Sequence, residues 1–346
     1  MEVVLQSLAT LDIGGGTQDF LLWRADQPLE NAVKAVLPSP TQAVAARIRR
    51  ARRQGRDVFL YGWLMGGGAM ASAVKEHLAA GLKVRATSQA AASLHDDPAK
   101  VKAMGVEIAE EGPPGAVAVF TTDIDLTAFS QMLCGFEASL PQTWALAVCD
   151  HGYSPGASNR KFRFQMWRDF LAKGGDMDHL MSLTPPPAMT RLQALAQQCP
   201  GALLMDTAAA ALWGALEDPA VAELAPGGVC VVNLGNMHTV GFLVRGRQVL
   251  GIYEHHTGCL DVKSLADHIE RFTACRLGDN EVFDSQGHGC AYLPGAPGKA
   301  LPVVITGPRR ALARGLGWTT AVPHGDVMLS GCFGLLAAAR ARQAEA

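Results

Sequence analysis

The segment LDIGGGTQDF, from Leu11 to Phe20, carries the clearest structural signal in this sequence. An apolar run from Ser7 to Ile13 leads into three glycines and a second apolar run starts at Phe20, which is typical of two strands joined by a tight turn. Consecutive backbone amides in such a turn form a cradle for an anion, and glycine lets a ligand approach closely. An ordinary hairpin turn is the alternative interpretation.

Two carboxylates flank the glycines of this turn, Asp12 before them and Asp19 after them. Mg²⁺ keeps several of its waters and needs only one or two carboxylates beside bound phosphates. We therefore expect Asp12 and Asp19 to hold Mg²⁺ through water.

The bulk properties favour a two-domain enzyme-like protein. The chain has 346 residues, 30 basic and 32 acidic, and a net charge of -2, so it lacks a positive field for nucleic acid. The start, MEVVLQSLAT, lacks the basic region and cleavage site of a signal peptide, which favours a cytoplasmic location. The most hydrophobic helical stretch, Gly201 to Leu216, is too short to span a membrane, so we expect no membrane partner. The eight cysteines form no CxxC or CxxxCxxC motif, which argues against a disulfide framework or an iron–sulfur cluster.

Strand and helix patterns alternate along the first half of the chain, which predicts an α/β sheet. The expected strands are Val58 to Trp63, Val84 to Ala86, Val117 to Thr121 and Trp144 to Cys149. The expected helices are Thr41 to Arg53 with Thr41 as its cap, Ala69 to Ala80, Ser88 to Leu94 and Leu126 to Phe136.

The second half repeats the order of the first: a hairpin, a third strand, a helix, a strand and a final helix. These elements are Val229 to Val244, Val249 to Tyr253, Leu260 to Phe272, Val303 to Thr306 and a helix after Ser330. We therefore expect lobe I at residues 1–222, with a partly irregular insertion near 150–190 and a helix at 207–216. Lobe II is expected at residues 226–346.

Five segments, in the same order along the chain, resemble motifs of the superfamily of actin, heat-shock chaperones and sugar kinases. LDIGGGTQDF resembles its first phosphate loop, VNLGNMHTVGFLV (Val232 to Val244) its second, and VVITGPRRAL (Val303 to Leu312) its adenosine segment. MDTAAAALWGAL (Met205 to Leu216) and MLSGCFGLLAAA (Met328 to Ala339) are similar to its two connecting helices, whose small side chains permit a close crossing. The resemblance implies two ribonuclease H-like lobes, the actin-like ATPase fold, with ATP and Mg²⁺ bound between them.

The resemblance assigns a set of nucleotide-binding residues: Gly14, Gly15, Gly16, Thr17, Gln18, Asn233, Gly235, Asn236, His238, Thr239, Gly307 and Arg309. One position departs from the superfamily, whose second phosphate loop usually starts with aspartate, whereas this chain has Asn233. Asparagine can orient a water or contact a phosphate but lacks the charge, so we expect slow or altered hydrolysis.

Three carboxylates are candidate catalytic residues: Asp12, Asp206 and Asp150. Asp206 begins the first connecting helix, near the place where chaperone-like members carry a catalytic carboxylate, and a helix cap is the equal alternative. Asp150 follows a strand at the edge where α/β sheets bind ligands, and a turn residue is its alternative.

Several polar and glycine-rich segments are candidates for substrate binding. The turn Gly66 to Gly68 precedes a helix whose amides could hold an anion, although close packing would also explain the glycines. The basic and aromatic stretch from Asn159 to Phe170 could recognise an anionic substrate or a protein partner, but a helix with a solvated basic face is favoured. The full set of candidates is Gly66, Gly67, Gly68, His151, Arg160, His255 and His256.

A transition-metal site is a further alternative for the His- and Cys-containing loops of lobe II. EHHTG places Glu254, His255 and His256 next to Cys259, and the later DSQGHGC contributes Asp284, His288 and Cys290. Adjacent histidines on a strand point to opposite faces, which argues against both binding one ion.

Six segments together resemble one uncharacterised family of actin-like ATPases over nearly the full length. These are DIGGGTQDF, VLPSPT, DHGYSPGASNRKFRF, VNLGNMHTVGFLV, EHHTG and TGPRRAL. The family has been labelled a pyruvate formate-lyase activating enzyme, but such a radical enzyme needs a CxxxCxxC loop, which this sequence lacks. We expect instead an ATP-dependent phosphotransferase or ATPase with an unidentified acceptor. The alternatives are a nucleotide-gated binding or activator protein and a metal-dependent enzyme.

Overall fold

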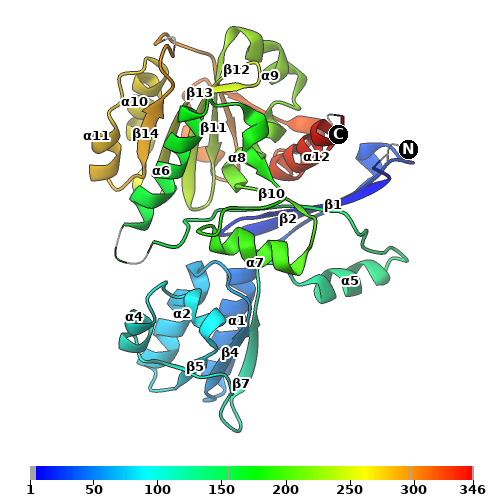
Figure 1. Ribbon diagram of the computed structural model, residues 1–346, viewed down its shortest axis with the longest axis vertical. Helices are drawn as coiled ribbons and strands as arrows, with labels where there is room; N and C mark the ends of the chain where they lie inside the picture. Colours follow the sequence, from blue (N-terminus) through cyan, green and yellow to red (C-terminus); the bar gives the residue numbers. More distant parts are fainter. Residues whose placement is uncertain (1–4, 155, 157, 297, 345–346) are drawn as a thin grey trace.

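The chain folds into three β-sheets with helices packed on their faces. The computed structural model describes residues 5–154, 156, 158–296 and 298–344, so the extreme ends of both expected lobes lie outside it. In Figure 1 lobe II lies at the top, the main sheet of lobe I lies below it, and a third sheet lies at the bottom. In the described ranges, no helix is long and apolar enough to cross a membrane.

The sheet of lobe I has the strand order β3-β2-β1-β8-β10-β9. Its strands are β1 (Ser7–Ile13), β2 (Thr17–Arg24), β3 (Val33–Pro38), β8 (Trp144–Val148), β9 (Met181–Ser182) and β10 (Leu203–Met205). Strands β1 to β3 form an antiparallel meander, and β8 and β10 add in parallel. All five residues of β8, WALAV, are buried, as expected for a strand covered on both faces.

The sheet of lobe II has the order β14-β13-β12-β11-β15-β16. Its strands are β11 (Val229–Leu234), β12 (His238–Arg245), β13 (Gln248–His256), β14 (Gly289–Tyr292), β15 (Val303–Thr306) and β16 (Thr319–Thr320). An antiparallel meander followed by two parallel strands repeats the arrangement of lobe I. This shared order is that of a ribonuclease H-like lobe, so the predicted fold class is confirmed.

Helices α8 (Thr207–Ala215) and α12 (Ser330–Ala344) pack against each other between the two sheets. Their backbones nearly touch: a methyl group at Gly214 would lie 1.7 Å from the carbonyl oxygen of Ser330, and one at Gly334 would lie 1.9 Å from that of Ala210. The small residues therefore permit the close crossing that the sequence predicts.

We expect Gly214→Ala to lower the free energy of unfolding by about 1–3 kcal/mol, because its methyl group would force the α8 and α12 backbones apart. Urea denaturation would measure the loss. Gly135→Ala is the matched control, because a methyl group there would lie 3.6 Å from its nearest neighbour, the carbonyl oxygen of Met132. Equal stability of the two variants would contradict the tight crossing.

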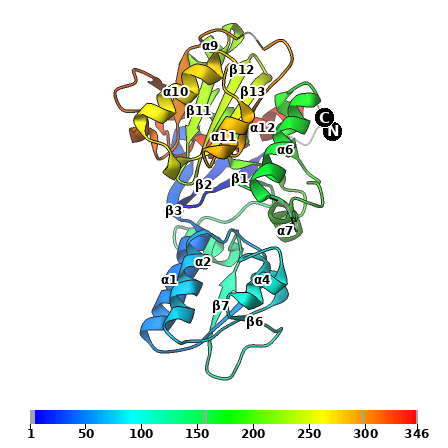
Figure 2. The same ribbon diagram turned by 90° about the vertical axis from the view of Figure 1, so that its left-hand side faces the viewer.

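Residues between β3 and β8 form a separate four-stranded parallel sheet of order β6-β5-β4-β7. Its strands are β4 (Val58–Gly62), β5 (Val84–Ala86), β6 (Val106–Ile108) and β7 (Val117–Thr121), and its helices are α1 (Pro40–Arg53), α2 (Gly68–Ala79), α3 (Ser88–Ala92) and α4 (Pro98–Ala103). It has its own apolar core, and Figure 2 shows it below the two lobes. The sequence predicts β4, β5 and β7 but not β6, and it groups them with β8, because local alternation does not reveal which strands pair.

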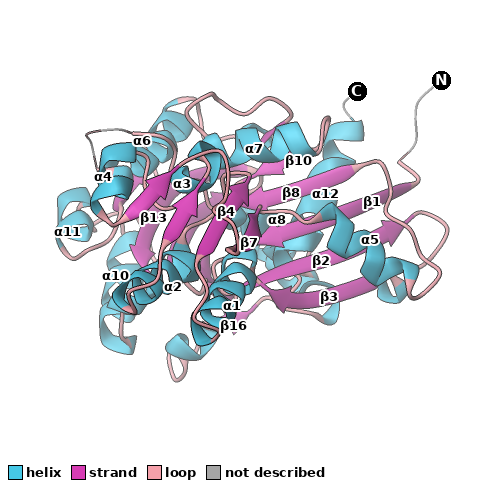
Figure 3. Ribbon diagram, turned by 90° about the horizontal axis from the view of Figure 1, so that it is seen from below, coloured by secondary structure: helices cyan, strands magenta, loops and turns pink. Residues whose placement is uncertain are grey.

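The remaining helices cover the two lobes (Figure 3). They are α5 (Leu126–Cys134), α6 (Asn159–Ala172), α7 (Thr190–Gln198), α9 (Pro219–Leu224), α10 (Val262–Thr273) and α11 (Asp279–Asp284). Helix α6 follows a strand of lobe I but packs against β13 and β14 of lobe II, so it joins the lobes. The region expected to be partly irregular, 150–190, contains this helix, a 3-10 turn at Met177–Leu180 and β9.

The start of α1 differs from the prediction. Ser39 is its N-cap residue and Pro40 its first helical residue, so Thr41 lies inside the helix. The Thr41 hydroxyl instead donates to the carbonyl oxygen of Gly67 at 2.7 Å and accepts from the Met70 amide at 2.9 Å. Thr41 therefore fixes the start of α2, next to the Gly66 to Gly68 turn, against α1.

Candidate functional site

The first glycine turn joins β1 to β2 and is held in a fixed shape. The Gly14 amide donates to the Thr17 carbonyl oxygen at 2.9 Å, which closes the turn. Ser39, just after β3, anchors it from the side: its amide donates to Gly16 at 3.1 Å and its hydroxyl to Gly15 at 3.0 Å.

The second turn, between β11 and β12, has the same construction. The Gly235 amide donates to the His238 carbonyl oxygen at 2.9 Å. Thr257, just after β13, donates from its hydroxyl to Gly235 at 2.8 Å and from its amide to Met237 at 2.9 Å. Thr257 thus takes the place that Ser39 has in lobe I, and the two turns are structural equivalents.

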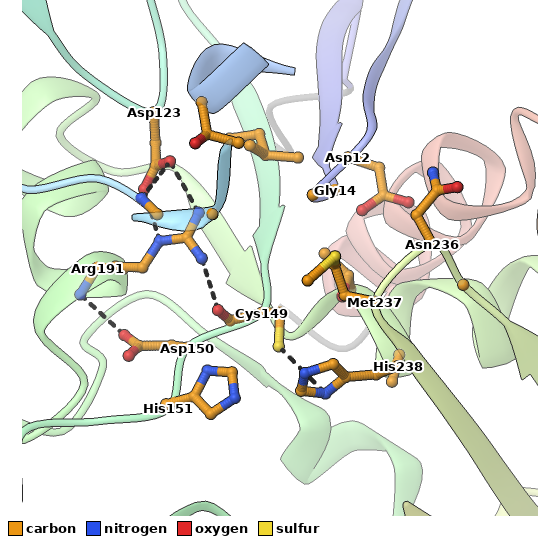
Figure 4. Close-up of a pocket in the computed structure, with 18 of the residues that line it drawn as sticks. Asp12, Gly14, Asp123, Cys149, Asp150, His151, Arg191, Asn236, Met237 and His238 are labelled. Carbon is orange, nitrogen blue, oxygen red and sulfur yellow. Dashed lines mark hydrogen bonds and ion pairs between the residues drawn. The ribbon is translucent and has the colours of Figure 1, made fainter. Parts of the chain in front are cut away.

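The tips of the two turns face each other. A methyl group at Gly15 would lie 2.5 Å from Met237 Cγ, and one at Gly16 would lie 2.4 Å from Asn236 Nδ2. Figure 4 shows Gly14, Asn236 and Met237 close together at one side of the cavity. The glycines are therefore required for the close approach of the loops.

Asp12 and Asp19 lie opposite each other in the β1–β2 ladder, beneath the first turn. Each has a buried Oδ1 without a hydrogen-bond partner in the described part of the chain. Burial, and then the Asp19 and Asp206 charges, raise the pKa of Asp12 well above its usual value. Burial and the Asp326 charge raise the pKa of Asp19 to about 7, although a hydrogen bond with Thr17 opposes this. Two carboxylates with free oxygens beside a phosphate-type loop fit a hydrated Mg²⁺ ion.

A cavity of about 450 Å³ opens between the lobes and the third sheet. Its volume lies within the usual range for small-molecule sites. The predicted residues that line it are Asp12, Gly14, Gly15, Thr17, Asp19, Gly66, Gly67, Gly68, Asp150, His151, Asn233, Gly235, Asn236, His238 and Gly307.

The other predicted nucleotide and substrate residues lie outside the lining of this cavity. Gly16 packs against Asn236, Gln18 donates to the Pro38 carbonyl oxygen at 3.0 Å, and Thr239 bonds to Thr257 at 3.0 Å. The Arg309 amide donates to the Leu234 carbonyl oxygen at 2.9 Å.

The start of the adenosine segment packs on the second turn. Gly307 adopts a φ of +96°, and a methyl group there would lie 2.5 Å from Asn233 Oδ1 and 2.6 Å from the Leu234 carbonyl oxygen. Glycine is therefore needed at Gly307 both for its backbone conformation and for this contact. Asn233 is held at the base of the cavity beside it.

Asp150 and Asp206 have their oxygens engaged by neighbouring groups. Asp150 accepts from the amides of Gly152, Arg191 and Leu192 at 2.8, 2.9 and 3.0 Å, while burial raises its pKa. Asp206 is the N-cap residue of α8, accepting from the Ala208 amide, and it also binds Arg163.

Arg163 on α6 lies at the centre of a buried charge network. It contacts Glu254 at 2.7 Å, Asp206 at 2.7 and 3.2 Å, and the Asp150 carbonyl oxygen at 2.9 Å. Its side chain is 1% exposed and that of Glu254 is 0% exposed. The solvated basic face that the sequence favoured is therefore wrong for Arg163, which joins α6 to both lobes.

Arg160 and the aromatic residues of α6 also have structural contacts. Arg160 donates to the carbonyl oxygens of Phe283 at 3.1 Å and Gly287 at 2.7 Å, so it docks α6 on lobe II. Phe164, Trp167 and Phe170 are buried in the core between the lobes.

Cys149 and several histidines gather beside the cavity. Cys149 Sγ lies 3.9 Å from His238 Nδ1 (Figure 4). The same nitrogen lies 2.6 Å from Glu254 Oε1. Burial opposes the charged forms of Cys149 and His238. The charges of Arg163, His238 and His151 nevertheless lower the pKa of Cys149, and Cys149 and Glu254 raise the pKa of His238. The pair therefore favours a thiolate and an imidazolium.

The two adjacent histidines of the EHHTG motif point to different surroundings, as expected for neighbours on a strand. His255 is buried, and its Nε2 lies 3.2 Å from Ser285 Oγ. The Nε2 of His256 lies 3.3 Å from the Nε2 of His288. Cys259 is exposed, and the described metal-ligand clusters contain neither Cys259, Asp284 nor Cys290.

Several site residues were not singled out from the sequence. Arg191 binds Asp123 with two contacts of 2.8 Å and lines the cavity beside Gly66. Ser39 and Thr257 support the two turns. The roles of these three residues depend on contacts between distant segments. The only signal in the sequence is that each follows a predicted strand or a turn-forming residue.

Comparisons with known proteins return a family and several solved structures. No curated protein matches. Residues 65–312 match the family model described as "Putative pyruvate format-lyase activating enzyme (DUF1786)".

The solved structures that match this chain differ strongly from it in sequence. A Bacteroides thetaiotaomicron protein with an actin-like ATPase fold and unknown function is 6% identical with a TM-score of 0.38, and the match covers 96% of each chain. The Clostridium difficile activator of 2-hydroxyisocaproyl-CoA dehydratase, with bound ADPNP, is 9% identical with a TM-score of 0.30, covering 98% of this chain and 97% of that one. The ethanolamine utilization protein EutJ from Carboxydothermus hydrogenoformans is 10% identical with a TM-score of 0.30, covering 97% and 90%.

The iron–sulfur chemistry that the family description suggests does not fit this chain. A cluster of this kind needs several cysteine thiolates at one place. In the parts of the chain that the structure describes, each potential metal-binding group contains at most one cysteine, Cys149. The family match itself spans more than half of the chain and includes the cavity segments from Met65 to Leu312. The chain is therefore a member of the DUF1786 family and has the actin-like ATPase fold.

Proposed function

We propose that this protein binds ATP with Mg²⁺ in the cavity between its lobes. One observation carries the proposal: two equivalent glycine turns, Gly14 to Thr17 and Gly235 to His238, face each other above carboxylates with unpartnered oxygens. Backbone amides would hold the phosphates, and Mg²⁺ would offset the charge of the carboxylates and phosphates. Asp12 and Asp19 would hold Mg²⁺ through its waters.

The remaining lining residues suggest how the ligand is oriented. Gly307 contacts Asn233 at the base of the second turn, which supports an adenosine position beside them. Gly66 to Gly68 and His151 line other parts of the same cavity, and they are the proposed contacts of a phosphoryl acceptor.

The proposed reaction is slow hydrolysis or transfer of the terminal phosphoryl group. Such a reaction needs mainly positioning, charge neutralisation and a group that orients the attacking oxygen. Of the three candidate acids, Asp12 is the one with an unpartnered oxygen, whereas Asp150 accepts three amides and Asp206 binds Arg163. We therefore assign Asp12 the main part in binding Mg²⁺ and give Asp150 and Asp206 the task of positioning Arg191 and Arg163.

A nucleotide-gated binding protein is the second candidate. Asn233 removes one expected charge from the site, and α6 links the lobes through Arg163. In such a protein, nucleotide binding would mainly change the position of one lobe relative to the other, and ATP would be hydrolysed little. ATP-dependent protection of α6 amides from hydrogen exchange, with no phosphate release, would favour this candidate. Steady phosphate release would favour the enzyme.

Isothermal titration calorimetry of the full chain tests the proposal. We expect saturable, one-site binding of ATP in the presence of Mg²⁺, and weaker binding with EDTA, because the phosphates would then face Asp12 and Asp19 without a cation. Absence of saturable ATP binding in Mg²⁺ by correctly folded protein would refute it.

A further inference from the structure

Four histidines from separate segments meet where β8 of lobe I approaches the sheet of lobe II. His151 follows β8, His238 begins β12, His256 ends β13, and His288 immediately precedes β14. The ring centroids of the three lobe II histidines lie 4.7 Å apart for His238 and His288, 4.8 Å for His256 and His288, and 5.1 Å for His238 and His256. One ring nitrogen from each of these three lies within 4.8 Å of the others.

Hydrogen bonds to Nδ1 fix the orientation of two of these rings. His238 Nδ1 lies 2.6 Å from Glu254 Oε1, and His256 Nδ1 lies 2.7 Å from the Gln286 carbonyl oxygen. Both acceptors hold a proton on Nδ1, so a metal ion would bind Nε2, and at His238 it would displace the second proton of the imidazolium. Metal-binding histidines nearly always have such a carboxylate or carbonyl partner on the other nitrogen.

The third ring, His288, is 2% exposed and poorly satisfied. Its Nε2 lies 3.3 Å from His256 Nε2, and its Nδ1 is a buried atom without a hydrogen-bond partner in the described ranges. Two imidazole nitrogens bound to one tetrahedral zinc ion at the usual bond length lie about 3.3–3.4 Å apart. The observed separation therefore fits a pair of ligands already in place.

We infer that His238, His256 and His288 form a binding site for a divalent transition-metal ion, with Zn²⁺ as the best match. Three imidazoles leave a fourth position for water or a substrate group, as in catalytic zinc sites. His238 also lines the proposed nucleotide cavity, so the ion would lie at its wall.

Cys149 is not a ligand in this assignment. Its Sγ lies 3.9 Å from His238 Nδ1, the nitrogen that bonds to Glu254, and so on the opposite side of the ring from the lone pair. His151 is 5.1 Å from His238 and 5.5 Å from His288 between ring centroids, and it completes the wall around the open position.

This site is chemically separate from the proposed Mg²⁺ site. Imidazole ligands suit Zn²⁺, whereas the Asp12 and Asp19 carboxylates suit Mg²⁺. The metal site does not require the proposed ATP binding, and all measurements below are made without nucleotide. Failure of one proposal therefore leaves the other standing.

Zn²⁺ titration against a chromophoric chelator tests the inference, using metal-stripped wild type and the variants His256→Asn, His288→Asn and His179→Asn. His179 is exposed on the 3-10 turn at Met177–Leu180 and is the matched control. We expect one equivalent of tightly bound Zn²⁺ in wild type and His179→Asn. We expect His256→Asn and His288→Asn each to lower the affinity for Zn²⁺ by more than roughly 100-fold, because 100-fold is about the largest loss caused by changing a residue that only contacts a metal ligand. Circular dichroism checks that each variant is folded.

Co²⁺ substitution then tests which atoms bind. We expect the visible absorption of tetrahedral Co²⁺ in wild type and in Cys149→Ser, without a thiolate-to-cobalt charge-transfer band. Such a band would overturn the three-imidazole assignment in favour of Cys149. The site itself would be overturned if the wild type bound Zn²⁺ no more tightly than the folded variants His256→Asn and His288→Asn.

Discussion

Replacing Arg163 with leucine should lower the free energy of unfolding by about 3–5 kcal/mol, because removal of one partner leaves buried charges uncompensated. Glu254 and Asp206 would both lose their guanidinium contact, and Glu254 is fully buried. The Asp150 carbonyl oxygen would lose a donor as well. Because these groups come from both lobes, we expect the two lobes to be destabilised together. Urea denaturation followed by circular dichroism would measure the change.

Arg168→Leu is the matched control for this prediction. It lies on the same helix and pairs with Asp279, but both side chains are more than a third exposed. Such surface pairs usually contribute up to about 1 kcal/mol. If Arg163→Leu were no more destabilising than Arg168→Leu, the buried network would not be what joins α6 to the lobes.

The second large effect concerns Asp12→Ala, which should weaken ATP binding in Mg²⁺ by about 10- to 100-fold, the range typical of outer-shell partners of a metal. In EDTA the variant should bind ATP at least as well as wild type, because a carboxylate that repels phosphates has been removed. The distinguishing result is therefore a loss of Mg²⁺ dependence. Calorimetric titrations with and without Mg²⁺ would measure it.

The same substitution should stabilise the protein in the absence of ligands. Asp12 has a buried oxygen without a partner, and burial raises its pKa well above its usual value. Removing an unsatisfied buried polar group should raise the free energy of unfolding by about 1–3 kcal/mol. Asp26→Ala, at an exposed position, is the control and should change neither property. An Asp12→Ala protein that keeps its full Mg²⁺ dependence would contradict the assignment of Asp12.

The turns and connecting helices could be predicted because their signals are local. Glycines that must approach a ligand or another helix are visible as LDIGGGTQDF and as the small residues around Gly214 and Gly334. The structure places both turns at one cavity, as the motif order implied. The sequence does not predict β3, because Pro38 at its end and Pro40 two residues later favour a connecting segment.

Other features depend on contacts between distant segments and have no local signal. Whether β4 pairs with β8 or with β5 and β7 is decided by long-range packing, so the third sheet could not be separated from lobe I. Arg163 has the sequence environment of a surface basic residue, and only the approach of Glu254 and Asp206 makes it buried. For the histidine cluster, the sequence names His256 and His288 as possible metal ligands, but only the fold brings His238 beside them.

A structure of the protein with a non-hydrolysable ATP analogue and Mg²⁺ would test the central claim most directly. We predict phosphate density between the Gly14 to Thr17 and Gly235 to His238 turns, a hydrated Mg²⁺ next to Asp12 and Asp19, and adenosine beside Gly307. A nucleotide bound outside this cavity, or a cavity that stays empty at saturating analogue, would contradict the account.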